Sequence, residues 1–147
     1  MSTLYADTSA IVRAYLEDEA DHSELRALLL DGLNAVITSE LARVEFARAV
    51  TAAARAGRTA EKQALLDRFD LDCRLDGPIR MLTLDAQRIL AGAFDLVLAH
   101  QVGTLDALHL ATALTERGNL ARVTEMAFVT RDEDQAAAAR AEGLEVL

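Results

Sequence analysis

Four acidic residues in distant parts of the chain have the type and placement that metal-assisted chemistry needs. Asp7 and Asp132 each follow a short apolar run that predicts a strand. Glu45 and Asp106 lie in segments whose apolar residues recur at helical spacing. Carboxylates that are brought together cannot all stay ionised cheaply unless a cation neutralises them. Oxygen ligands suit Mg²⁺ or Mn²⁺, and such ions support the hydrolysis of phosphodiesters.

Alternating strands and helices would position these acids. Strands are expected at Leu4–Ala6, Ala35–Ile37, Met81–Leu84, Met126–Thr130 and Leu144–Leu147. Helices are expected at Ser9–Leu16, Asp21–Leu30, Thr38–Ala56, Thr59–Leu71, Asp85–His100, Thr104–Gly118 and before Gly143. This order predicts a single α/β domain over residues 1–147, with three α/β/α layers and a mostly parallel sheet. The carboxyl ends of parallel strands meet at one edge, so the four acids are expected to converge there.

The two acids that follow strands also have structural explanations. Asp7 is also explained as a turn residue, with Ser9 capping the next helix. Asp132 and Gln135 have the spacing of a capping box, in which each side chain bonds the other residue's backbone. For these two positions, residue type and spacing leave both interpretations open.

The two acids in helices have structural explanations of a different kind. Asp106 follows Thr104, a candidate N-cap, and an acid in the first turn complements the helix dipole. Glu45 has Arg48 three residues later, which favours an ion pair on the helix surface. His109 lies on the same helix face as Asp106 and fits a hydrogen-bonded core histidine.

Composition narrows the class of protein. The chain has 147 residues, a formal net charge of −9 and 52% hydrophobic residues, which is typical of a globular domain with a full core. Its acidity is unusual for a protein that coats duplex nucleic acid. The single cysteine, Cys73, excludes an internal disulfide. No secretory signal or membrane-length apolar run is present, so a cytoplasmic protein is expected.

Four segments of the chain resemble the motifs of PIN-domain proteins. They are Asp7–Val12, Ser39–Ala49, Thr104–Ala113 and Phe128–Asp132, and they occur in the family's order. The third is the most specific, and the ordered set spans residues 4–147. The size of the chain resembles that of VapC toxins, the ribonuclease partners in bacterial type II toxin–antitoxin pairs.

The resemblance implies a Mg²⁺- or Mn²⁺-dependent endoribonuclease that cuts structured RNA such as a tRNA or a ribosomal RNA loop. It also implies a homodimer and a VapB-type antitoxin that covers the site. Asp7, Glu45, Asp106 and Asp132 match the family's acids, and Asp134 is an alternative for the last of them. Asp7 and Asp106 would be the main metal ligands, while Glu45 and Asp132 would hold metal waters or a second ion.

Other residues are candidates for contacts with RNA or a second chain. Possible phosphate ligands are Arg13, Arg43, Arg48 and Arg131, with Thr8 or Ser9 reaching the metal or a phosphate oxygen. The apolar faces near Leu25–Leu30 and Ala60–Leu71 are expected to be shared between chains. In the helix Asp85–His100, the residues expected to face inward are Ile89, Leu90, Phe94, Val97 and Leu98.

Three other functions compete with the nuclease. A receiver-like phosphoacceptor domain needs a lysine near its acids, whereas Lys62, the only lysine, lies in a polar helix. A haloacid-dehalogenase-type phosphatase needs an Asp-x-Asp motif where this chain has Asp7-Thr8-Ser9. A non-catalytic RNA-binding or partner-binding PIN module is disfavoured only because all four acids are kept.

Overall fold

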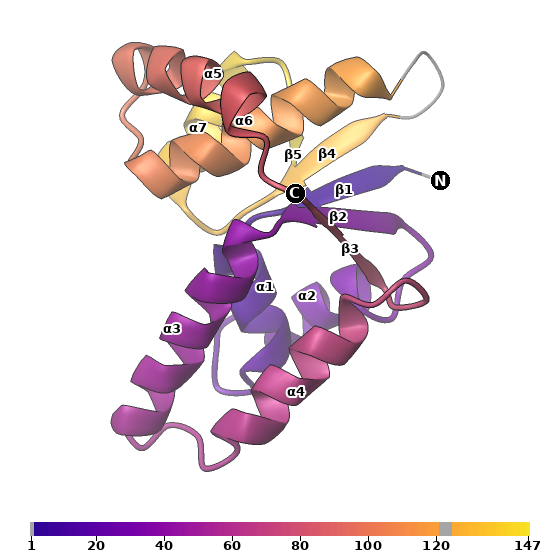
Figure 1. Ribbon diagram of the computed structural model, residues 1–147. Coiled ribbons are helices and arrows are strands. Elements are labelled where there is room, and N and C mark those ends of the chain that lie inside the picture. Colours follow the sequence, from indigo (N-terminus) through magenta and orange to yellow (C-terminus); the bar gives the residue numbers. More distant parts are fainter. Residues whose placement is uncertain (1, 121–124) are drawn as a thin grey trace.

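A five-stranded, fully parallel sheet forms the centre of the fold. The computed structural model describes residues 2–120 and 125–147. Its strands are β1 (Thr3–Ala6), β2 (Ala35–Ser39), β3 (Ile79–Leu82), β4 (Met126–Val129) and β5 (Glu145–Val146). Their order across the sheet is β3-β2-β1-β4-β5 (Figure 1). The chain therefore builds outward from the central β1 in both directions, which makes the carboxyl end of β1 a topological switch point.

Helices cover both faces of the sheet, and this confirms the predicted three-layer α/β/α fold. One face carries α1 (Thr8–Tyr15), α2 (His22–Leu29), α3 (Leu41–Arg55) and α4 (Lys62–Asp72). The other carries α5 (Ala86–Ala99), α6 (Thr104–Asn119) and α7 (Glu133–Ala141). Figure 1 shows these two helical layers below and above the sheet. No described helix has the length and apolar character needed to cross a membrane.

Alternation along the buried strands divides the core into two apolar layers. In β1, Leu4 and Ala6 pack with α1–α4, whereas Tyr5 packs with α5–α7. In β4, Phe128 faces the same side as Tyr5, and the two rings stack with their centroids 5.4 Å apart. The period of two that a strand imposes thus directs the Tyr5 hydroxyl under α6, which carries two residues of the candidate site.

Several predicted boundaries shift by a few residues. β3 begins at Ile79 rather than Met81, because the fully buried Ile79 pairs with Val36 of β2. Asp7, not Ser9, is the N-cap of α1, since its carboxylate accepts the Ser9 N–H. Gly103, not Thr104, is the N-cap of α6. Thr104 is the first residue of the helix, and no side chain caps this helix end.

The prediction of shared apolar faces is wrong for α2. Leu25 and Leu29 are buried in the protein's own core, against the sheet and neighbouring helices. Several exposed apolar residues instead lie together on α5, where Phe94 is 65% and Leu98 is 73% exposed. Of the five α5 residues expected to face inward, only Ile89 is buried, since α5 packs against α6 through one stripe alone. α5 is therefore apolar on two sides and buries one of them.

Candidate active site

The four acids singled out in the sequence line one cavity of about 380 Å³. Asp7 follows β1, Asp132 follows β4, Glu45 lies on α3, and Asp106 lies in the first turn of α6. The cavity therefore opens at the carboxyl ends of the central strands, where a parallel sheet brings such residues together. Asp134 is exposed on α7 and is not among the residues that line this cavity.

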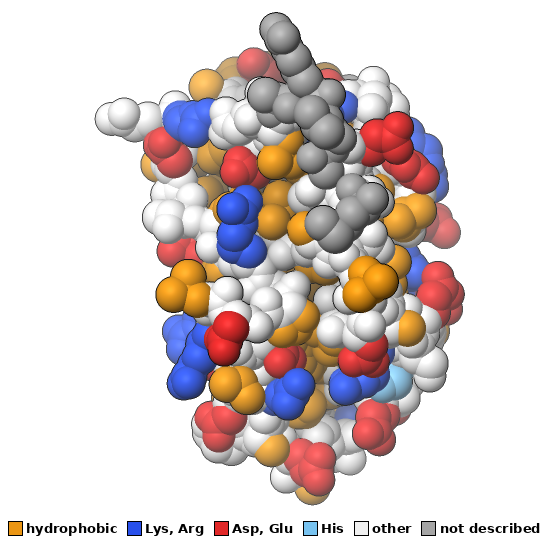
Figure 2. Space-filling model, turned by 90° about the vertical axis from the view of Figure 1, so that its right-hand side faces the viewer, with side chains coloured by type: hydrophobic (Ala, Val, Ile, Leu, Met, Phe, Trp, Pro, Cys, Tyr) orange, Lys and Arg blue, Asp and Glu red, His pale blue; other side chains and the backbone are white. Residues whose placement is uncertain are grey.

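The opposite end of the molecule differs in character. Figure 2 views the end where the strands begin, and acidic and basic side chains are interspersed there among apolar ones. At the carboxyl end, none of the four cavity acids forms an ion pair with a described arginine or lysine. The cavity therefore contains acids whose charge no described arginine or lysine neutralises through an ion pair.

Asp7 is both a helix cap and a wall of the cavity. It is only 3% exposed, and its Oδ2 accepts the Ser9 N–H at 3.0 Å. Its Oδ1 accepts a second bond, from Gln135 Nε2 at 3.1 Å. Asp7 therefore does have a structural role at the start of α1, but capping uses only one of its two carboxylate oxygens. Both bonds come from neutral N–H groups, so the charge of this buried carboxylate has no direct cationic partner except the possible charge of His109, 3.9 Å away.

Gln135 is a residue of the site that sequence reasoning missed. Its side chain is fully buried, accepts from Thr130 Oγ1 at 2.6 Å and donates to Asp7 and to the backbone oxygen of Asp106. Only half of the predicted capping box forms, since the Gln135 N–H donates to Asp132 Oδ1 while the Gln135 amide turns toward Asp7. The spacing signalled a cap, but no local pattern reveals that the amide links three segments of the chain.

Glu45 is held by residues from other elements rather than by Arg48. His109, fully buried on α6, places Nε2 at 2.6 Å from Glu45 Oε1, and Thr8 donates to the same oxygen at 3.0 Å. Tyr5 lies behind the imidazole, with its hydroxyl 2.9 Å from His109 Nδ1. A carboxylate can only accept, so the Nε2–H of His109 donates to Glu45 whether the ring is neutral or protonated.

The titration of Tyr5 and His109 follows from this arrangement. Burial and the charge of Asp7 raise the pKa of Tyr5 well above its usual value, so its hydroxyl keeps its proton. Burial lowers the pKa of His109, but the hydrogen bond with Glu45 and the nearby carboxylate charges outweigh that effect and raise it. The hydrogen-bonded chain Tyr5–His109–Glu45 therefore runs from the core to the cavity and ends in the bond that His109 donates to Glu45.

Asp106 shows the electrostatic effect of crowding these acids. Burial, followed by the charges of Asp7 and Asp132, raises the pKa of Asp106 to about 6. The charge of His109 acts in the opposite direction but does not offset these effects. A carboxyl group whose ionised form is disfavoured by its neighbours gains from any cation that enters the cavity.

The donor set fits a hard divalent cation that keeps most of its waters. Among the described residues, no group of three or more His, Cys, Asp and Glu side chains is arranged to hold a metal ion together. Mg²⁺ does not need such a cage, because it is commonly held by one or two carboxylates, with water and substrate oxygens completing its shell. The carboxylate oxygens of the cavity and their negative charge are sufficient to hold Mg²⁺ in this way.

The four candidate arginines divide into two groups. Arg13 and Arg48 line the cavity and stay candidates for phosphate ligands. Arg43 instead forms a two-bond ion pair with Asp70 outside the cavity, at 2.8 and 2.9 Å. Arg131 is bound to acids of the α1–α2 region and to the backbone oxygen of the C-terminal residue. Nearby acids therefore hydrogen-bond two of the four candidates, Arg43 and Arg131, and Asp21 also lies 3.9 Å from Arg13.

Comparisons with solved structures give the same architecture. VapC20 of Mycobacterium tuberculosis, described as a toxin that cleaves the sarcin–ricin loop, matches with a TM-score of 0.62, 19% identity and coverage of 92% of this chain and 94% of that chain. VapBC2 of Rickettsia felis, solved with a promoter DNA fragment, matches with a TM-score of 0.65, 15% identity and coverage of 99% and 97%. A toxin–antitoxin complex of Klebsiella pneumoniae matches with a TM-score of 0.58, 19% identity and coverage of 92% and 91%.

Sequence comparison provides the family. Among curated proteins, no relative matches this chain. The family model of the PIN domain matches residues 4–141, a span that includes all four cavity acids. The structural likenesses, all below 25% identity, agree with this match in fold. The chain therefore belongs to the PIN domain family.

Proposed function

We propose that this protein is a metal-dependent endoribonuclease and the toxin of a type II toxin–antitoxin pair. The observation that carries the proposal is the single cavity in which Asp7, Glu45, Asp106 and Asp132 meet without an arginine or lysine partner among the described residues. Lys62 is exposed at the start of α4 and does not line this cavity, which argues against a receiver-like phosphoacceptor.

The four acids would have unequal roles. Asp7 and Asp106 would be the main ligands of Mg²⁺ or Mn²⁺, while Glu45 and Asp132 would hold the waters around it or a second ion. When bound, such an ion supplies positive charge that lowers the pKa of water and offsets the charge that develops on the phosphate. Gln135 and His109 would keep Asp7 and Glu45 oriented, because each donates to one carboxylate from a buried position. Asp134 has no place in this proposal, since it lies outside the cavity.

Cleavage of RNA by the purified protein tests this proposal. We expect structured RNA to be cut in Mg²⁺ or Mn²⁺ and the reaction to stop in EDTA. The Asp106→Asn variant, which keeps the shape of the side chain, is the control for a contaminating nuclease. Cleavage that continues in chelator, or that is equal in the variant, would refute the metal mechanism.

The structural neighbours support a protein partner for the proposed toxin. The Klebsiella pneumoniae neighbour is a toxin–antitoxin complex, and the Rickettsia felis neighbour is a VapBC assembly on promoter DNA. We infer a VapB-type antitoxin for this chain, encoded beside it. Co-expression with the adjacent small open reading frame should give a stable complex in which RNA cleavage is blocked. Separate elution of the two proteins would contradict this inference.

The exposed stripe of α5 supports a homodimer. Its members, three of them about half exposed or more, are Leu90, Phe94, Val97 and Leu98. Contiguous apolar surface of this kind marks interaction sites in soluble proteins. Leu98→Glu should therefore convert a dimer to a monomer in light scattering, whereas Leu33→Glu, at a loop position that is even more exposed, should not. A wild-type monomer at micromolar concentration would contradict the dimer.

A further inference from the structure

Two cavities meet at Asp132. One is the carboxylate cavity already described, and the other is a groove of about 450 Å³ along the turn between β4 and α7. The groove is lined by Thr130, Arg131, Asp132, Glu133, Ala136 and Arg140. An extended, chain-like ligand in the carboxylate cavity can therefore continue past Asp132 into the groove. A compact ligand would have no need of the second groove.

The arginines around the two cavities differ in whether acids already bind them. Arg13 lies 3.9 Å from Asp21, and Arg131 binds the same carboxylate at 3.0 Å. Arg48 and Arg140 are exposed, and neither forms a hydrogen bond or an ion pair through its side chain with any residue in the described part of the chain. These two guanidinium groups are thus available to an external anion.

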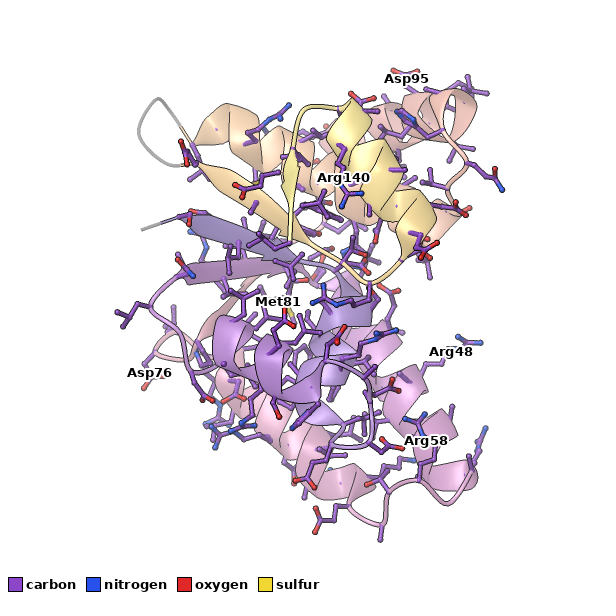
Figure 3. All side chains as sticks on the ribbon, turned by 180° about the vertical axis from the view of Figure 1, so that it is seen from behind. Arg48, Arg58, Asp76, Met81, Asp95 and Arg140 are labelled. Atoms are coloured by element: carbon purple, nitrogen blue, oxygen red, sulfur yellow. The ribbon has the colours of Figure 1, made fainter. Side chains whose placement is uncertain are left out.

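The two available arginines lie on opposite sides of the site. Arg48 projects from α3 beside the carboxylate cavity, and Arg140 lies on α7 over the groove, in line with Ala136 and Glu133 at helical spacing. Figure 3 labels both, with the turn between β4 and α7 passing between their helices. A ligand that contacts both must cross the carboxylates. Repeating negative charge along such a ligand is the chemistry of a nucleic-acid backbone, and guanidinium groups suit phosphate.

We propose that one strand of the RNA substrate runs from Arg48, across the carboxylates, to Arg140, and that these two arginines bind phosphates on opposite sides of the scissile bond. This inference rests on the proposed endoribonuclease function. In a chain with a net charge of −9, the general surface repels RNA, so two local cations have a large share in fixing the strand's register. Arg131, by contrast, has a structural role, because its guanidinium donates to Asp21 and to the backbone oxygen of Leu147.

Binding and kinetics of arginine variants test the path. Arg48→Gln and Arg140→Gln are compared with Arg55→Gln on the same helix as Arg48 and Arg80→Gln on β3, two exposed arginines that line neither cavity. Binding of a fluorescent single-stranded RNA oligonucleotide is measured by anisotropy over a salt series, in an Asp106→Asn background with Mg²⁺. Cleavage is measured with Asp106 intact.

Each site variant should lower the salt slope of log Kd by about 0.7, the value for one phosphate contact on a single strand, and the double variant by about 1.4. KM should rise while kcat changes little, since these contacts bind substrate and transition state alike. The Arg55 and Arg80 controls should match the parent protein. Unchanged slope and KM in Arg140→Gln, with wild-type cleavage intact, would overturn the path and leave the nuclease standing. Lost slope without any cleavage by the wild type would support the path and refute the nuclease.

Discussion

Two buried aspartates in this molecule have opposite surroundings. Asp72, at the end of α4, and Asp7, at the end of β1, are each 3% exposed. Asp72 accepts the Tyr15 hydroxyl at 2.7 Å and lies 3.1 Å from the guanidinium of Arg68. Asp7 accepts only the neutral N–H groups of Ser9 and Gln135.

The difference separates an acid that serves the fold from one placed for a ligand. Burying a charge is costly unless it is paired, and Asp72 meets that requirement through Arg68. Asp7 has no such hydrogen-bonded cation: its nearest cationic group is the imidazole of His109, 3.9 Å away, and the carboxyl of Asp106, with its raised pKa, is also nearby. A protein that keeps such an arrangement carries an uncompensated charge that a bound cation would neutralise.

The largest expected effect comes from removing the charge of Asp7. Asn at this position keeps one carbonyl oxygen, which can accept the Ser9 N–H and cap α1, so the fold should be kept. Its NH2 group replaces the oxygen that accepts from Gln135, and the Gln135 amide must turn its own oxygen toward it. Loss of metal-assisted charge stabilisation, which amounts to several kcal/mol, should lower RNA cleavage by roughly a hundredfold or more. Cleavage assays and melting curves in EDTA measure both quantities. We expect Asp7→Asn to melt at or above the wild-type temperature.

Asp72→Asn is the matched control for that variant. It should leave cleavage per folded molecule unchanged, because Asp72 lies in the α1–α4 layer and does not line the carboxylate cavity. Equal loss of cleavage in the two variants would erase the distinction between the two aspartates.

The second largest expected effect is a loss of unfolding free energy when Asp72 is replaced. Asp72→Ala leaves the Tyr15 hydroxyl buried without an acceptor, which costs about 1–3 kcal/mol of unfolding free energy. The surrounding rings of Phe46 and Phe69 offer no hydrogen-bond acceptor of comparable strength. Urea unfolding of Asp72→Ala, Tyr15→Phe and the double variant gives the coupling energy. Strict additivity of the two changes would show that the bond contributes nothing.

An effect of intermediate size is expected when the two buried tyrosines, Tyr5 beside the cavity and Tyr15 beside Asp72, are each replaced by Phe. Tyr5→Phe removes the hydroxyl beside His109 Nδ1 and keeps the ring that stacks on Phe128. Loss of one hydrogen bond, about 1 kcal/mol, should lower cleavage roughly fivefold through the orientation of His109 and Glu45. Tyr15→Phe makes the same chemical change at the α1–α4 contact and should leave cleavage unchanged. A decrease in both variants would indicate a general effect on folding.

The sequence predicted the convergence of the four acids because that depends on rules that act along the chain. Asp7 and Asp132 end strands, and the carboxyl ends of parallel strands share an edge whatever the details of packing. Asp106 follows Gly103 at the start of a helix, which is a local signal as well. The residue numbers of the carboxylate cavity therefore follow from strand ends, helix starts and the motif resemblance.

Contacts between distant elements were not predictable in the same way. The spacing of Glu45 and Arg48 favours an ion pair on one helix, but His109 reaches Glu45 from α6, and nothing in α3 announces that neighbour. α5 has apolar residues on two sides, and the choice of Ile89 over Phe94 for the core depends on where α6 packs. Tertiary packing decides both outcomes.

The smallest expected effect is a pH dependence of stability from Asp106. Its pKa is about 6 in the folded protein and about 4 in an unfolded chain, so the folded state holds the extra proton between these values. Stability from this group is fully present below about pH 4 and is lost as pH rises through about 6. The effect is modest because Asp106 is only half-buried and solvent screens its neighbours' charges.

Other carboxyl groups change the stability of the protein with pH in the opposite direction, so their contribution must be subtracted. A bond from Arg43 lowers the pKa of Asp70, so that pair loses stability as pH falls. The useful quantity is therefore the difference between wild type and Asp106→Asn in metal-free urea unfolding from pH 4 to pH 7. Relative to the variant, the wild type should become steadily less stable as pH rises, and saturating Mn²⁺ should abolish that trend, because a bound cation stabilises the ionised carboxylate. A flat difference in metal-free buffer would show that Asp106 titrates as it does in an unfolded chain, and the contrast between the crowded acids and the paired Asp72 would then rest on Asp7 alone.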